Sequence, residues 1–186
     1  MNINIFINAL KMGKIIAYPT ESVFGLGCDP DNKEAVYTLL SIKKRDINKG
    51  LILVASKYQQ LLNYINEKKI TKNQKKKILA TWPGMITWII PTSSNTPNWL
   101  IGNFTSIAVR VSKHPLIQNL CNGFGKPIVS TSANISGMSP CSTSKEVLKH
   151  FKKVKKDILI LNGKTGNYNK PSEIRDGITN FVIRKG

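Results

Sequence analysis

Short apolar runs rich in β-branched residues alternate along this chain with segments of helical spacing, and this alternation constrains the fold more than any other feature. The runs end at Pro, Gly or clusters of polar residues, which is typical of buried strands. The expected strands cover residues 15–18, 51–54, 85–90, 106–111, 126–129, 158–161, 172–175 and 181–184.

Apolar residues at helical spacing predict helices near 5–10, 33–44, 71–82 and 115–121. Segment 20–30, rich in Gly and turn residues, is expected to be a loop. Strands and helices interleave without strict βαβ order, and no repeat or linker divides the chain. The sequence therefore predicts one α/β domain over residues 1–186, with an open, twisted, mixed sheet flanked by helices.

Composition narrows the class of protein. With 186 residues, 41% of them hydrophobic, the chain can bury a sizeable core, and no apolar run approaches the roughly 20 residues of a membrane span. Its start lacks the pattern of a signal peptide. Cys28, Cys121 and Cys141 lie far apart, so neither a disulfide framework nor a zinc site is indicated. A cytoplasmic protein without its own metal site is expected.

The formal charge of +18 comes almost entirely from lysine, because only four of the 28 basic residues are Arg. Many lysines fall in two clusters, 68–77 and 145–156, each predicting first the solvated face of a helix and second a nucleic-acid footprint. A joint excess of Lys, Asn and Ile is typical of AT-rich coding, so part of the charge need not be functional. The scarce arginines are more informative, since a guanidinium grips phosphate or carboxylate through two donors.

A polar octapeptide, 130–137 with sequence STSANISG, follows the expected strand 126–129. Its hydroxyl and amide groups offer several hydrogen bonds at the point where a buried strand ends, as a polar or anionic ligand requires. A Ser/Thr/Asn-rich turn that bonds its own backbone is the alternative.

Further polar clusters stand at other strand ends. Alternation in strand 106–111 places Arg110 opposite Ile107, Val109 and Val111. The remaining clusters are Tyr18–Gly27, Lys43–Gly50, Pro171–Arg175 and Arg184. Each has a structural alternative, because Lys43 and Arg45 could cap a helix and Arg110 could be an exposed strand residue. Together, cations and neutral donors suit a ligand with phosphate or carboxylate groups. His114 and His150 have no ligand-like neighbours and are expected to be structural or surface residues.

Taken in order, these motifs resemble the YrdC-like family of threonylcarbamoyl-AMP synthases in its short bacterial form, over essentially the whole chain. The resemblance implies an open α/β sheet with a concave basic face. It also implies a nucleotidyltransferase that converts ATP, L-threonine and bicarbonate or carbon dioxide into threonylcarbamoyl-adenylate and pyrophosphate. A partner transferase complex would then modify the adenosine next to the anticodon of tRNA.

The resemblance also assigns residues. Nucleotide-binding residues would be Lys43, Arg45, Lys49, Ser106, Ser132, Asn134 and Arg184. Threonine-binding residues would be Thr20, Ser22, Arg110, Ser130 and Ser172. Lys43 and Arg45 would stabilise developing charge, no covalent nucleophile is expected, and Mg²⁺ would arrive with ATP. Two positions depart from the family pattern: Asp46 where Pro is frequent, and Ser22 where Thr is frequent.

Two other functions fit part of the sequence. A basic RNA-binding or ribosome-assembly factor without catalysis would use the lysine clusters, and such a surface could also give an enzyme weak affinity for tRNA. A carbamoyl-handling domain of hydrogenase maturation shares the implied fold but ordinarily comes with further domains.

Overall fold

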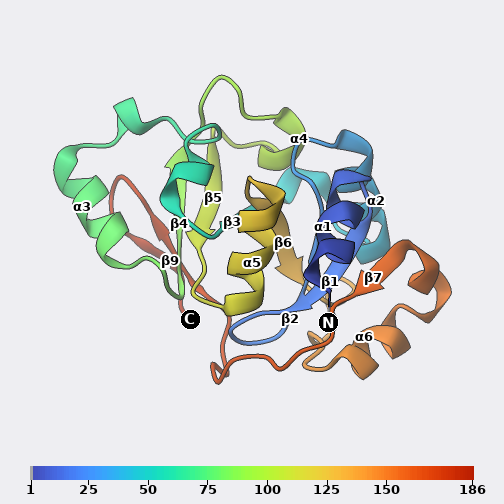
Figure 1. The fold of residues 1–186 in the computed structure, drawn as a ribbon. Helices are drawn as coiled ribbons and strands as arrows, with labels where there is room; N and C mark the ends of the chain where they lie inside the picture. The colour runs from blue at the N-terminus through green and yellow to red at the C-terminus, as the bar shows by residue number, and fades with distance from the viewer. Residues whose placement is uncertain (1) are drawn as a thin grey trace.

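The computed structural model describes residues 2–186, apart from the side chains of residues 155 and 156. Its strands form one nine-stranded sheet in the order β7-β1-β2-β6-β3-β5-β4-β8-β9 (Figure 1). The strands are β1 (Ile15–Pro19), β2 (Phe24–Gly27), β3 (Ile52–Ala55), β4 (Ile86–Pro91), β5 (Ser106–Val111), β6 (Ile128–Ser132), β7 (Ile158–Ile160), β8 (Glu173–Asp176) and β9 (Val182–Arg184).

Parallel and antiparallel pairs occur side by side in this sheet. β1 pairs with β7, β3 with β5 and β4 with β8 in parallel, whereas the other neighbours are antiparallel. The predicted mixed sheet is therefore confirmed, and all the predicted strands are present with bounds that differ by at most three residues from those expected.

The prediction of a loop over residues 20–30 is wrong for residues 24–27, which form β2, and is confirmed for the residues on either side. β2 pairs with β1 on one side and with β6 on the other. Its glycines serve close packing: a Cβ on Gly27 would lie 2.5 Å from the carbonyl oxygen of Val129 and 2.9 Å from a ring carbon of Tyr18. Glycine in a strand often marks such a close approach, but local sequence does not separate it from a turn glycine.

Four of the helices match predicted segments. They are α1 (Ile3–Lys11), α2 (Lys33–Lys43), α3 (Lys72–Ala80) and α5 (Pro115–Phe124). Side chains of Asn2, Asn32 and Thr71 cap the first three, and Thr71 forms a capping box with Gln74. Two short α-helices, α4 (Asn98–Ile101) and α6 (Ser144–His150), are also present, and α6 overlaps the first half of the second lysine cluster.

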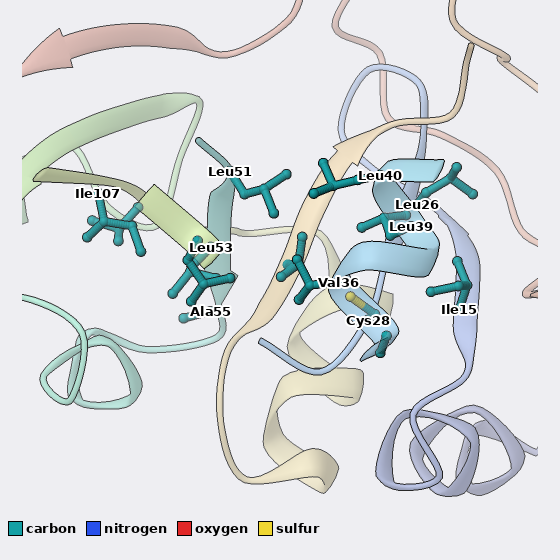
Figure 2. Close-up of a cluster of buried hydrophobic side chains, with 14 of the residues drawn as sticks. Ile15, Leu26, Cys28, Val36, Leu39, Leu40, Leu51, Leu53, Ala55 and Ile107 are labelled. Carbon is teal, nitrogen blue, oxygen red and sulfur yellow. The ribbon is translucent and has the colours of Figure 1, made fainter. Parts of the chain in front are cut away.

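Helices α1 and α5 pack together on one face of the sheet (Figure 1). Their apolar side chains meet strand residues such as Tyr18, Val54 and Ile128. The opposite face forms the larger core, where α2 contributes side chains to a cluster from β1, β2, β3 and β5 (Figure 2). Ile107, Val109 and Val111 belong to this larger core.

Because side chains alternate along each strand, Ile52, Val54, Ala108, Arg110 and Ser130 face the side of the sheet that carries α1 and α5. The two helices cover only part of that side. The polar positions beyond them line an open pocket.

Replacing Gly27 with Ala should lower the free energy of unfolding by about 2–3 kcal/mol, because the new Cβ has no room beside Val129. Urea unfolding measures this loss. Gly125→Asn is the matched control: nothing lies within 4 Å of a Cβ at Gly125, and its left-handed backbone (φ 85°) suits Asn, so a loss of about 1 kcal/mol or less is expected. Equal losses in the two variants would contradict the close approach at Gly27.

Candidate functional site

The pocket has a volume of about 350 Å³, within the range of small-molecule sites. Its walls come from the turn after β1, the segment after α2, the ends of β3, β5 and β6, and the C-terminal strands. The predicted site residues in its lining are Thr20, Ser22, Arg45, Lys49, Ser106, Arg110, Ser130, Ser132, Ser172 and Arg184. The structure thus brings together residues more than 160 positions apart in sequence.

Charge in the pocket is of one sign. Arg45, Lys49, Arg110 and Arg184 line it, and the lining residues that the structure describes include no Asp or Glu. An apolar wall completes the pocket, formed by residues that include Leu51, Leu100, Ile101 and Phe104. Such a pocket suits an anionic ligand with an apolar portion.

Arg110 is almost fully buried, with 6% of its surface exposed. Its Nη1 lies 2.9 Å from Oε1 of Glu21, which is 3% exposed. Ser112 Oγ and the backbone N–H of Lys113 donate to the same oxygen, at 2.6 and 3.2 Å. Burial opposes ionisation of Glu21, but Arg110 and the hydrogen bond from Ser112 outweigh it and lower the pKa of this carboxyl.

Ser130 accepts a hydrogen bond of 2.8 Å from the hydroxyl of Tyr18, which is fully buried in β1. Since this bond occupies an acceptor site of Ser130, the Ser130 hydroxyl proton can point into the pocket. Thr20 donates to the carbonyl of Val23 at 2.7 Å and accepts from the N–H of Ser22 at 3.3 Å. Thr20 therefore shapes the turn that presents Ser22.

Ser172 and Arg184 close the pocket from the C-terminal strands. The hydroxyl groups of Ser172 and Thr87 lie 2.8 Å apart, and Arg184 Nη2 donates to the carbonyl of Ser172 at 2.7 Å. Arg45 Nη2 donates to the carbonyl of Gly50 at 3.0 Å, which fixes the segment that carries Lys49.

Lys43 and Asn134 lie outside the pocket lining. Lys43, 2% exposed, donates through Nζ to the carbonyls of Ser132 at 2.5 Å and Asn134 at 2.7 Å. Asn134 accepts from Ser132 Oγ at 2.5 Å and donates to the carbonyls of Ile135 and Met138 at 3.1 and 2.7 Å. The octapeptide thus combines both predicted alternatives: its first three residues continue β6 and line the pocket, and the residues after them form a self-bonded loop.

Burial, with Arg45 nearby, lowers the pKa of Lys43 to about 8. The Lys43 ammonium donates its hydrogen bonds to the carbonyls of Ser132 and Asn134. Its predicted direct contact with the ATP phosphates stays a prediction. Asp46, the departure from the family pattern, is exposed and caps the 3₁₀ turn Ile47–Lys49 by accepting from the N–H of Asn48 at 2.9 Å. Its carboxylate is not among the pocket-lining groups of the described chain.

Sequence reasoning did not assign a role to Glu21 or Tyr18. Glu21 directly follows Thr20 inside a recognised polar cluster, and it is the one charged residue of segment 18–27. That charge was the available signal. Tyr18 gave none, because a tyrosine at the end of an apolar strand is normally a core residue.

The remaining titratable candidates lie elsewhere. His114 precedes α5, with Nε2 3.4 Å from the carbonyl of Lys164, and His150 Nδ1 lies 3.0 Å from Cys141 Sγ. Neither belongs to the described pocket lining. The three cysteines are buried and free. Among residues 2–186 no helix is long and apolar enough to cross a membrane.

Replacing Lys43 with Met should lower the free energy of unfolding by about 2–3 kcal/mol, because two buried carbonyls lose their donor. Lys44→Met is the matched control, since Lys44 is the exposed neighbour at the helix end and its loss should be below about 0.5 kcal/mol. Urea unfolding of both variants measures these losses. A Lys43→Met variant as stable as Lys44→Met would contradict the stabilising role of the hydrogen bonds from Lys43.

The comparisons with known proteins agree with this geometry. Residues 8–186 match the family model Sua5_yciO_yrdC, described as "Telomere recombination". The chain is 53% identical over 180 residues to a protein of Vibrio parahaemolyticus named threonylcarbamoyl-AMP synthase, covering 97% of this chain and 96% of the relative.

Solved structures show the same fold. Sua5 of P. abyssi complexed with L-threonine superposes with a TM-score of 0.86 at 28% identity; the match covers 94% of this chain and 50% of that protein, so this chain spans half its length. YciO of E. coli gives a TM-score of 0.83 at 25% identity, covering 99% of this chain and 88% of that one. The family model and the similarity to the Vibrio protein over nearly the full chain show that the chain belongs to the Sua5/YciO/YrdC family.

Proposed function

We propose that this protein is a threonylcarbamoyl-AMP synthase, which forms L-threonylcarbamoyl-adenylate from ATP, L-threonine and bicarbonate or carbon dioxide and releases pyrophosphate. The observation that carries this proposal is that four cations converge in one pocket with hydroxyl groups from distant strand ends. Relatives that carry this name match over nearly the full chain.

Threonine is proposed to bind at the Arg110 end of the pocket. Arg110 would hold the carboxylate, and hydroxyl groups nearby would bind the polar atoms of the amino acid. These hydroxyl groups belong to Thr20, Ser22, Ser130 and Ser172. Support comes from the P. abyssi Sua5 structure, which contains L-threonine in a homologous fold.

ATP is proposed to bind along the other cations. Arg45, Lys49 and Arg184 would face the triphosphate, with Ser106 and Ser132 as neutral donors. We assign Lys43 and Asn134 an indirect share in nucleotide binding, because their hydrogen bonds fix the loop that presents Ser132.

The proposed chemistry requires alignment and charge stabilisation. The threonine amine adds to carbon dioxide and loses a proton, giving a carbamate. A carbamate oxygen attacks the α-phosphorus of ATP, the bond to the β-phosphate oxygen breaks, and pyrophosphate leaves. Negative charge grows on the leaving group, where fixed cations such as Arg45 and Lys49 would stabilise it. No step forms a bond between substrate and protein.

We propose that Mg²⁺ arrives bound to the triphosphate. The described pocket lining offers no carboxylate, and the described residues hold no cluster of three or more His, Cys, Asp or Glu that could form a metal cage. We therefore assign no residue of this chain to the metal, and no step above depends on one.

The product is proposed to serve threonylcarbamoyladenosine synthesis next to the anticodon of tRNA, through a separate transferase complex. A cytoplasmic setting fits ATP as substrate and the three free thiols. The net charge of +18 would add weak, salt-dependent affinity for tRNA. A solely RNA-binding function would leave unexplained the buried ion pair and the hydroxyl groups around the pocket.

The direct test is pyrophosphate release by the purified protein. Release should require L-threonine and bicarbonate together with ATP. ATP turnover that threonine leaves unchanged would refute the proposed function.

In the same assay, Arg110→Ala should lower kcat/KM for threonine by about 30- to 1,000-fold, corresponding to the 2–4 kcal/mol of a charge-assisted contact in a desolvated site. Arg175→Ala is the matched control, because Arg175 pairs with Glu173 outside the pocket and its loss should change kcat/KM less than about threefold. Circular dichroism verifies that both variants are folded. Equal effects of the two substitutions would rule out a specific role for Arg110.

A further inference from the structure

We propose that Glu21 is a positioning residue for threonine binding: it holds Arg110 by Nη1, so that the Nε–Nη2 edge of the guanidinium faces the substrate carboxylate. This inference rests on the proposed function and adds a residue for which sequence reasoning gave no role.

The donors around Glu21 converge on one oxygen atom. Oε1 forms an ion pair with Arg110 Nη1 and accepts hydrogen bonds from Ser112 Oγ and the N–H of Lys113. Both hydrogen-bond donors come from the segment that directly follows β5, whereas Glu21 follows β1. The carboxylate therefore joins two strand ends and is itself fixed in orientation by two donors besides Arg110.

The partners of Arg110 among the described residues all lie at Nη1. Besides Glu21, they are the carbonyl of Gly84 at 3.4 Å and Met85 Sδ at 3.6 Å. Nε and Nη2 have no such partner among the described residues, and neither atom is sealed from solvent. Arg110 also lines the pocket. That leaves a two-donor edge accessible from the pocket, with the geometry that a carboxylate accepts.

Glu21 itself does not reach the substrate. It is absent from the described lining, and its second oxygen, Oε2, is sealed from solvent without a hydrogen-bond partner. Its influence must therefore pass through Arg110.

The arrangement also compensates charge. A lone buried guanidinium would repel the ammonium group of threonine, whereas a guanidinium paired with Glu21 can bind the carboxylate of a zwitterion with less repulsion.

Steady-state kinetics of Glu21→Gln in the pyrophosphate assay test the inference. The KM for L-threonine should rise about 10- to 100-fold, the effect of misplacing a binding group, while the KM for ATP stays within about twofold. Glu67→Gln is the matched control: Glu67 is ion-paired with Lys75 outside the pocket, so both KM values should stay at the wild-type level. An unchanged KM for threonine, or parallel rises in both KM values, would overturn the proposal.

Ser112→Ala covers the case in which Glu21→Gln does not fold. This variant keeps both charges and removes one of the donors that orient Glu21. A rise of at least about threefold in the KM for threonine alone supports the proposal, and a wild-type KM overturns it.

Calorimetric titration with L-threonine and L-threoninamide separates this proposal from the proposed function. The amide lacks the carboxylate, so its affinity should differ little between wild type and Glu21→Gln, whereas threonine affinity should fall. If the wild type shows no threonine-dependent turnover, the proposed function fails, and the titration still decides whether Glu21 orients a carboxylate site. Equal threonine affinity in wild type and Glu21→Gln overturns the inference.

Discussion

The incomplete cover of one sheet face is the constraint on which the rest of this structure depends. In β3 and β5 the face away from α1 and α5 is covered by the larger core, so its strand positions there are apolar. The other face is covered by α1 and α5 only in part, and the strands continue beyond them. Alternation along β5 thus places Val109 in the core and Arg110 in the pocket, one residue apart.

The pocket gathers cations that repel one another, and the buried carboxylate of Glu21 offsets this repulsion at Arg110. Glu21 compensates the charge of Arg110 through an ion pair. Lys43 fixes the end of β6 through its hydrogen bond to the carbonyl of Ser132. Neither of these two groups is part of the described lining. The site is therefore built in two layers: outer groups that meet solvent or ligand, and inner groups that fix their orientation.

Much of the fold was predictable because strands and helices here carry strong local patterns. The exceptions have two separate physical causes. β2 was not predicted because Gly25 and Gly27 suggested a turn. In the structure these glycines allow close packing against Tyr18 and Val129. α4 is a single turn, too short for any periodic pattern.

The identity of most residues in the candidate site was predictable, but their contacts with one another were not. Resemblance to the family supplied the outer residues, and the pocket contains most of them. It did not show that Lys43 is bonded to Asn134, nor that Glu21 pairs with Arg110. Those contacts join segments about 90 residues apart in sequence. Local patterns in a single sequence do not reveal which distant segments meet in the fold.

Mass spectrometry of the reaction with ¹³C-labelled bicarbonate tests the central claim most directly. The account predicts an adenylate that contains threonine and one labelled carbon, formed only when ATP, L-threonine and bicarbonate are all present. An unlabelled threonyl-adenylate, or no adenylate at all from the folded protein, would contradict it.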